Sequence, residues 1–502
     1  MKIRISISHI LPIFIALSAC SGQLNVESPP IITAESPNVQ MDNLARKIDE
    51  VTARVMEEEH IPGAAIVIVK NGKTVLKRGY GFANLDENIK VSPDKTLFRI
   101  GSVSKALTLQ ALVRLADQGV IDMDDDISQY IPAFANIPNT SESNEPVKIR
   151  HLVTHTTGLD QIGLDRHIWE LEKTLDERKA LRPSLEEFLF NGNLRRTSPP
   201  GLHYRYDTYG TTLAGLVLEK VTGKNYAQAM DEALFKPLGM SRSYVEAPDE
   251  VFGDLAIGYG FVNEGYGIAP YEVYVTPPAS SIDATPADMG LLLEVLTQDS
   301  ALLKPQFRPH PDFPGMTRGL MERPTADEQG RHPIRSIGHG GSMLGFRTSF
   351  IVIPELNLGY FVITNRNSEA GGGRVSLHGK INDIILDAYH TAQMPKSEIV
   401  PTIDPFIDLS KYEGTYYYGV FCQSCTPEEF ERGAWKKSSP QIVSAKNGIL
   451  FLGEDPYHMR KNQEGVFIKA DGSRKISFGQ SADGKISFFS YGTSPDTFER
   501  ID

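Results

Sequence analysis

The first folded segments show two different spacings of apolar residues. From 41 to 59 the apolar positions recur at helical spacing, and those on one face are Leu44, Ile48, Val51 and Val55. Two strand-like runs follow, joined by Asn71-Gly72, a dipeptide that supplies the positive φ angles of a two-residue hairpin turn. This part of the sequence therefore predicts a helix followed by a β-hairpin.

Further along, the same reading predicts an α+β domain. A long apolar run at 102–118 predicts a buried helix that ends at Gly119. Strand-like runs return at 347–365 and are followed by a helical stretch at 373–392, with helices and Pro/Gly-rich loops in between. Strands at both ends and helices between them predict one antiparallel sheet completed by the C-terminal half of the domain.

The last hundred residues have a different pattern. Short aromatic and β-branched runs alternate with Asn-Gly and Asp-Gly turns. Closely spaced strands of this kind predict a small all-β barrel or sandwich. We therefore expect a main domain over 41–395 and a C-terminal β domain over 405–502.

The N-terminus predicts export. Lys2 and Arg4 precede an apolar stretch that is too short to cross a membrane, as in a secretory signal. The end of this stretch, Leu-Ser-Ala-Cys, resembles the lipobox of bacterial lipoproteins. That resemblance implies a signal peptide over 1–19, a lipid on Cys20 and a tether over 20–40, hence a bacterial cell-envelope location, periplasmic in a Gram-negative cell. An ordinary signal peptide cut nearby is the alternative.

Charge and cysteine usage narrow the partners. The net charge of −12 argues against a nucleic-acid partner, because phosphate binding needs a basic surface. Cys422 and Cys425 are spaced C-x-x-C, and in an exported chain they predict a local disulfide, with free thiols as the alternative. No metal site is expected, since His151 and His155 lack the glutamate of the H-E-x-x-H pattern.

The strongest candidate chemistry lies at the start of the predicted helix 102–118. Ser102 and Lys105 are three residues apart, which places both side chains on one helix face about one turn apart. The unpaired N–H groups of a first helical turn favour negative charge, and a nearby lysine can assist deprotonation of the serine. The alternative is that Ser102 only caps the helix and Lys105 is solvated. A second pair with this spacing, Ser92 and Lys95, is followed by strand-like residues, so Ser92 reads as a turn serine.

Three other segments, 149–160, 198–223 and 336–354, follow in order. Together with Ser102 and Lys105 they resemble the serine β-lactamase and penicillin-binding-protein superfamily, near the class C β-lactamases, over roughly 41–390. The resemblance implies an antiparallel sheet flanked by helices, an all-helical subdomain and no metal or organic cofactor. It also implies that Ser102 is the nucleophile and Lys105 its partner.

The same resemblance assigns roles in the later segments. Tyr206 matches the tyrosine that acts as general base and acid, and Thr208 stands where an asparagine is usual in the Y-x-N element. His339-Gly340-Gly341 matches the third element, expected on an edge strand, where glycines let the backbone approach substrate closely. The backbone N–H groups of Ser102 and Ser342 are the implied oxyanion hole.

The sequence therefore predicts a lipid-anchored serine hydrolase that acts through an acyl-enzyme on a small-molecule or peptidoglycan-type substrate. β-Lactams, D-amino-acid peptides and small esters are the competing classes. A histidine at 339 is a weak carboxylate anchor near neutral pH, which favours esters or other amides. The alternative is a non-catalytic envelope binding or sensor protein that retains the fold.

Overall fold

The computed structural model of the chain describes residues 37–501 except 142, 161–166, 169, 193, 312, 326–333, 368–375, 390–407, 420–424, 427–438, 460–463, 472, 473, 482 and 493. We call residues 37–389 the main domain and residues 408–501 the barrel domain. The predicted signal peptide and Cys20 lie outside the described residues. Within the part of the chain that is described, no helix combines the length and apolar character needed to cross a membrane.

The main domain is built on one antiparallel sheet of eight strands in the order β11-β12-β13-β14-β15-β1-β2-β3. Its strands are β1 (Gly63–Lys70), β2 (Lys73–Asn84), β3 (Ile89–Lys90), β11 (Met316–Thr317), β12 (Leu320–Thr325), β13 (Ile334–Met343), β14 (Phe346–Ile353) and β15 (Leu358–Thr364). β15 pairs with β1, so strands from the two ends of the domain meet in the middle of the sheet. This confirms the predicted α+β fold.

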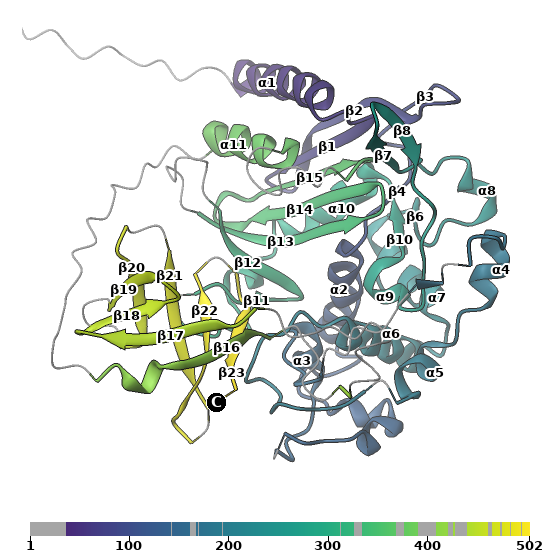
Figure 1. Cartoon of the computed structure of the whole chain (residues 1–502). Helices are drawn as coiled ribbons and strands as arrows, with labels where there is room; N and C mark the ends of the chain where they lie inside the picture. The colour runs from purple at the N-terminus through teal and green to yellow at the C-terminus, as the bar shows by residue number, and fades with distance from the viewer. Residues whose placement is uncertain are drawn as a thin grey trace, which may run out of the picture.

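Helices cover both faces of this sheet (Figure 1). α1 (Pro37–Glu58) and α11 (Leu377–Tyr389) pack on one face around a separate apolar cluster. α1 begins four residues before the predicted position, with proline at the first helical residue, where its missing N–H costs nothing. On the other face lie α2 (Val103–Asp117) and α10 (Pro286–Leu296).

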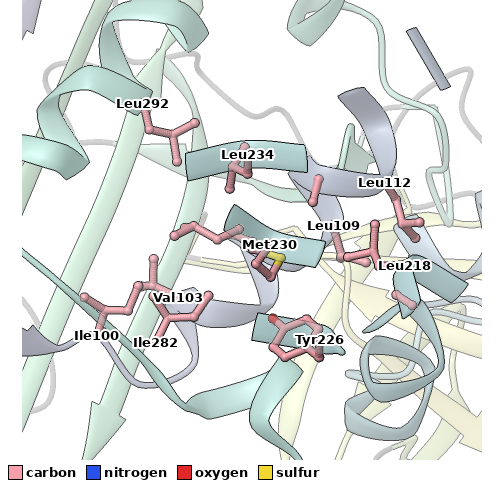
Figure 2. Packing of buried hydrophobic residues seen from close by; sticks show 14 of the residues in the cluster. Ile100, Val103, Leu109, Leu112, Leu218, Tyr226, Met230, Leu234, Ile282 and Leu292 are labelled. Carbon is pink, nitrogen blue, oxygen red and sulfur yellow. The ribbon is translucent and has the colours of Figure 1, made fainter. Parts of the chain in front are cut away.

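The rest of the main domain is largely helical and surrounds α2. Its helices are α3 (Ile149–Val153), α4 (Leu175–Ala180), α5 (Leu185–Phe190), α6 (Thr208–Thr222), α7 (Tyr226–Met230), α8 (Asp249–Phe252) and α9 (Pro277–Ser280). Short strands complete it: β4 (Phe98–Arg99), β5 (His167–Ile168), β6 (Ser243–Val245), β7 (Tyr259–Val262), β8 (Gly265–Ile268), β9 (Val273–Tyr274) and β10 (Ile282–Ala284). Leu109 and Leu112 of α2 pack with residues of α6 and α7, among them Leu218 and Met230, and Val103 lies beside Ile282 of β10 (Figure 2). Because α2 is buried on nearly all sides, its first turn is held rigidly.

The barrel domain is a closed barrel of eight strands, which confirms the predicted small all-β domain. The strands are β16 (Gly414–Tyr418), β17 (Gln441–Lys446), β18 (Ile449–Leu452), β19 (Asp455–Met459), β20 (Val466–Lys469), β21 (Lys475–Gln480), β22 (Ile486–Tyr491) and β23 (Thr497–Arg500). Aromatic rings dominate its core, among them Tyr412, Tyr416, Phe467, Phe478 and Phe489. The barrel lies beside β11, β12 and the helical part of the main domain (Figure 1).

Candidate active site

Ser102 occupies the N-cap position of α2, yet its side chain makes no capping hydrogen bond. Gly101 before it has a φ of +56°, a conformation that favours glycine and turns the chain sharply into the helix. The hydroxyl of Ser102 therefore does not cap the helix, as the alternative interpretation expected. It lies 3.4 Å from the Nζ of Lys105.

Lys105 is 1% exposed, so it is not the solvated residue of that alternative. Its Nζ donates to the carbonyl of Ala279 in α9 at 3.0 Å and lies 4.9 Å from the centre of the Tyr206 ring. A buried ammonium is costly unless polar partners replace water, and a carbonyl and an aromatic face both do so. The structure thus brings the amine, the serine hydroxyl and the tyrosine ring together.

Tyr206 reaches this cluster from the segment just before α6. The next residue, Asp207, is the N-cap of α6, and its carboxylate accepts from the Gly210 N–H at 2.7 Å and from the Thr157 hydroxyl. These contacts fix the chain on one side of Tyr206. Its ring, half-buried, lies between those of His155 and His339, with centroid distances of 5.6 and 5.8 Å.

Thr208, at the position where the resemblance expects asparagine, is the first residue of α6 and is buried. Its carbonyl accepts from the Thr212 hydroxyl at 2.8 Å. A contact between Thr208 and substrate stays a prediction.

β13 carries His339, Gly340, Gly341 and Ser342 past the start of α2. The strand is not at the edge of the sheet along its whole length, because β12 pairs with 334–338. From 339 to 343 the described pairing is with β14 alone, so the expected edge is confined to this outer half. The predicted edge strand was thus only partly right, since the short β12 ends at the level of Gly338.

Glycines allow β13 and α2 to approach closely at this edge. A Cβ on Gly341 would lie 2.2 Å from the carbonyl oxygen of Ile100, and a Cβ on Gly101 would lie 3.2 Å from the backbone nitrogen of Ser342. The backbone of Ser342 therefore runs beside the N-terminus of α2. This arrangement suits two N–H groups, of Ser102 and Ser342, that converge on one oxyanion.

The two histidines beside Tyr206 are neutral but have opposite hydrogen-bonding character. In His339, Nδ1 lies 2.6 Å from the Gly340 carbonyl, so Nδ1 carries the proton and Nε2 is an acceptor. In His155, Nδ1 accepts from the Asp207 N–H at 3.2 Å, so Nε2 carries the proton. Both Nε2 atoms are buried without a hydrogen-bond partner in the described part of the chain.

Burial explains why both rings are neutral. It lowers the pKa of His339 well below its usual value, and the charge of Lys105 lowers it further. The same two causes lower the pKa of His155 to about 3. At neutral pH neither ring can hold a carboxylate by charge, so each offers only a hydrogen bond.

Sequence reasoning missed several of these neighbours. His155 was treated as part of a structural segment, although the segment 149–160 was one of those that carried the family resemblance. Ala279 gave no signal, nor did Asn367, whose Nδ2 donates to the Ser342 hydroxyl at 2.7 Å. These groups reach the site only through the tertiary fold.

The remaining predicted features lie elsewhere. His151 accepts from the Lys148 N–H at 3.0 Å and so caps α3. Among the described residues no group of three or more His, Cys, Asp or Glu side chains is arranged to hold a metal ion. Cys425 is disulfide-bonded and packs against the main-domain core, whereas Cys422 lies outside the described residues, so the predicted pairing stays a prediction.

Comparison with known proteins gives concordant results. A family model described as "Beta-lactamase" matches residues 48–378. Protein flp of Staphylococcus aureus (strain N315) is 27% identical over 338 residues, 64% of this chain and 64% of that protein. Esterase EstB of Burkholderia gladioli is 30% identical over 222 residues, 42% of this chain and 54% of the esterase. The chain thus spans less than two thirds of the length of these curated relatives.

Among solved structures, the octameric penicillin-binding protein homologue from Pyrococcus abyssi is similar in fold. The superposition covers 90% of this chain and 99% of that one, with a TM-score of 0.54 and 21% sequence identity. The likeness in fold therefore extends over nearly the whole chain.

Proposed function

The chain belongs to the β-lactamase family, and from that premise we propose that it is a hydrolase that cleaves an ester or amide through an acyl-enzyme on Ser102. The observation that carries the proposal is the uncapped Ser102 hydroxyl, 3.4 Å from the Nζ of a buried lysine. A serine that only ended the helix would use its hydroxyl on a backbone N–H.

In this mechanism the Ser102 oxygen attacks the substrate carbonyl while its proton passes either to Lys105 in its neutral amine form or to Tyr206 in its phenolate form, which the Lys105 ammonium would stabilise. The carbonyl oxygen becomes an oxyanion held by the N–H groups of Ser102 and Ser342. Collapse of the tetrahedral adduct breaks the bond to the leaving group, which takes up the proton. Each N–H donor of this kind typically contributes about 100- to 1000-fold to the rate.

Deacylation repeats these steps with water. The base removes a proton from the attacking water, the second tetrahedral adduct collapses, and the proton returns to the Ser102 oxygen. His339 presents a neutral acceptor nitrogen beside Tyr206, which suits it to accept a hydrogen bond from the substrate and so orient it; the predicted help to the leaving group would need a proton on this nitrogen.

We propose small esters or uncharged amides as the substrate class. Its support is the neutral state of His339, which lacks the charge that would anchor the carboxylate of a β-lactam or of a D-amino-acid peptide. The esterase among the relatives is in keeping with this preference. A panel of p-nitrophenyl acetate, nitrocefin and a D-alanyl-D-alanine peptide should show the highest kcat/KM on the ester.

Labelling by a fluorophosphonate tests the nucleophile. Ser102→Ala should abolish labelling in a protein that remains folded, because the site then has no serine oxygen to attack the phosphorus of the probe. Ser92→Ala is the matched control, since Ser92 has the same spacing to a lysine but directly precedes a turn and opens no helix, and it should label like the parent. Labelling of Ser102→Ala at the parental rate would refute the proposal, and a parent that neither labels nor turns over ester would favour a binding protein.

Tyr206→Phe tests the proton transfers. Removing the phenolic hydroxyl should slow turnover of the best substrate by about 100- to 10,000-fold, the usual range for general acid–base catalysis. Near-parental kcat in this variant would exclude Tyr206 from the mechanism.

We further propose that the protein is anchored in the bacterial cell envelope by a lipid on Cys20. Its support is the sequence around that residue alone. Cys20→Ser should release the protein from the membrane fraction of expressing cells, and retention there would contradict the proposal.

A further inference from the structure

The barrel domain grips the segment that carries Tyr206. Arg205 donates from Nε and Nη2 to the two carboxylate oxygens of Glu499 in β23, both at 2.6 Å. The guanidinium is 3% exposed and the carboxylate 7%. Two parallel charge-assisted bonds between planar groups define both distance and orientation, so this pair sets the position of Arg205 sharply.

Two more contacts hold the same segment. The Thr497 hydroxyl in β23 donates to the carbonyl of Tyr204 at 2.8 Å. His203 meets Phe488 of β22 edge-on, with ring centres 5.0 Å apart. Three consecutive residues before Tyr206 thus contact the barrel domain.

Arg205 also connects these barrel contacts to His155, on the other side of Tyr206. Its backbone N–H donates to the carbonyl of His155 at 3.0 Å, and its Nη1 donates to the Thr197 hydroxyl at 2.9 Å. His155 is one of the two rings that flank Tyr206. A shift of Arg205 would therefore move the backbone of Tyr206 and its neighbour together.

We propose that Glu499 is a positioning residue for the reaction, which acts on Tyr206 through Arg205. The inference rests on the proposed function, because it assigns a purpose to the position of Tyr206. Asp207 holds the chain on the far side of Tyr206 from within the main domain, while on the near side the barrel domain supplies the carboxylate. Without Glu499 the guanidinium would be left buried with its strongest partner missing, and it would be drawn toward water.

A double-mutant cycle tests this on the full chain. Glu499→Gln keeps the shape but removes the charge, and it should lower kcat on p-nitrophenyl acetate by roughly 10- to 100-fold, the cost of a small misplacement of a catalytic group. KM should change less, because no substrate contact is removed. In a Tyr206→Phe background the same substitution should change the rate by less than about twofold, since the group it positions has lost its function.

A loss by the same factor in both backgrounds would overturn the proposal, because the effect would then not pass through Tyr206. Parental kcat in a folded Glu499→Gln protein would overturn it as well. Glu464→Gln is the matched control: its carboxylate pairs with Lys411 in the same domain but is 73% exposed, so it should leave kcat unchanged.

If Glu499→Gln fails to fold, the double variant Arg205→Met/Glu499→Met gives the answer, because replacing both members of a buried ion pair with apolar residues is well tolerated. A folded double variant should still have reduced kcat, because two apolar side chains do not fix the orientation of the segment as the two parallel Arg205–Glu499 bonds do; parental kcat would refute the proposal. Failure of the proposed function itself looks different, because it appears as fluorophosphonate labelling of Ser102→Ala whatever Glu499→Gln does.

Discussion

The main sheet of the main domain and the barrel domain have the same number of strands but arrange them in opposite ways. The eight strands of the main sheet form an open sheet with helices on both faces, whereas the eight strands of the barrel domain close on themselves around aromatic rings. In the open sheet, β12 pairs with β13 only as far as Gly338. Among the described strands, the backbone of β13 from 339 to 343 is therefore unpaired on one side. The closed barrel presents no such edge.

This difference assigns different roles to the two domains. An unpaired strand edge is a place where N–H groups remain available for an oxyanion or a substrate, so the chemistry gathers at β13. A barrel whose interior is filled with side chains can act only through its outer wall, where Glu499 and Thr497 meet the segment before Tyr206. The main domain supplies the proposed reacting groups, from the start of α2, the segment before α6 and this edge of β13, and the barrel domain supports the segment before Tyr206.

The largest expected effect comes from removing an aromatic ring from the barrel core, which should destabilise the barrel domain and not the main domain. Phe489 is fully buried, and Phe489→Ala should cost about 3 to 5 kcal/mol in the free energy of unfolding of the barrel domain. Hydrogen exchange should show lost protection in the strands 414–500 and little change in β1 or β15. Ile442→Ala, at an exposed barrel position, should change stability by less than about 0.5 kcal/mol. Equal loss of protection in both domains would mean that they unfold as one unit.

Two neighbouring glycines test the open edge. Gly341→Ala places a methyl group against the Ile100 carbonyl and should lower kcat by about 100- to 1000-fold, the cost of a lost oxyanion donor. A Cβ on Gly340 meets its nearest atom, the Thr348 carbonyl oxygen, only at 3.8 Å, so Gly340→Ala should have a much smaller effect. Similar losses in the two variants would show that the approach of β13 to α2 is not what the site requires.

A fall in pH should destabilise the main domain more than the barrel domain. Burial lowers the pKa of His155 and His378 to about 3 and that of His203 to about 4. Each takes up a proton near pH 6.5 when unfolded but not when folded, so stability is lost as the pH falls below 6.5, by about 2 kcal/mol per histidine at pH 5. Asp283, whose pKa burial raises to about 6, opposes this because its protonation favours the folded state.

The chain from 414 to 500 contains one histidine, His458, at a half-buried position. Hydrogen exchange at pH 5 and pH 7 should therefore show the main domain losing protection before the barrel domain. His378→Phe, far from Ser102 in sequence and on α11, should reduce the pH dependence of main-domain stability. Earlier loss in the barrel domain would contradict this account.

The smallest expected effects come from two hairpin turns of the same kind, one in the main sheet and one in the barrel. Asn71-Gly72 and Asn447-Gly448 both have positive φ at each residue and join adjacent antiparallel strands. Gly72→Ala and Gly448→Ala should each cost about 1 kcal/mol, measured by urea denaturation, because alanine resists this conformation. A cost in only one turn would show that the other hairpin is held by its surroundings.

These turns also show what the sequence can predict. The hairpin at Asn71-Gly72, the buried helix after Ser102 and the strand-rich C-terminal domain were all evident from local spacing and turn chemistry. The order of Ser102, Tyr206 and His339 along the chain was enough for a family resemblance, and the structure brings them together with Lys105.

Other parts of the site depend on contacts that sequence spacing does not reveal. That Ser102 forms no capping bond, and that Ala279 receives the Lys105 amine, follow only from how α2 and α9 pack. The unpaired edge at His339 exists because β12 is short, and the sequence of β12 gives no sign of where its pairing with β13 ends. Glu499 is one of many acidic residues until the barrel domain is placed against Arg205.

The ion pair between Arg205 and Glu499 has a consequence for biosynthesis. The two residues are 294 positions apart, so at translation rates of about 5 to 20 residues per second Arg205 is made roughly 15 to 60 s before its partner. Throughout that interval the main domain holds a guanidinium whose carboxylate has not yet been synthesised. The segment before Tyr206 can take its final form only after β23 has been synthesised, so this part of the candidate site is the last to be completed.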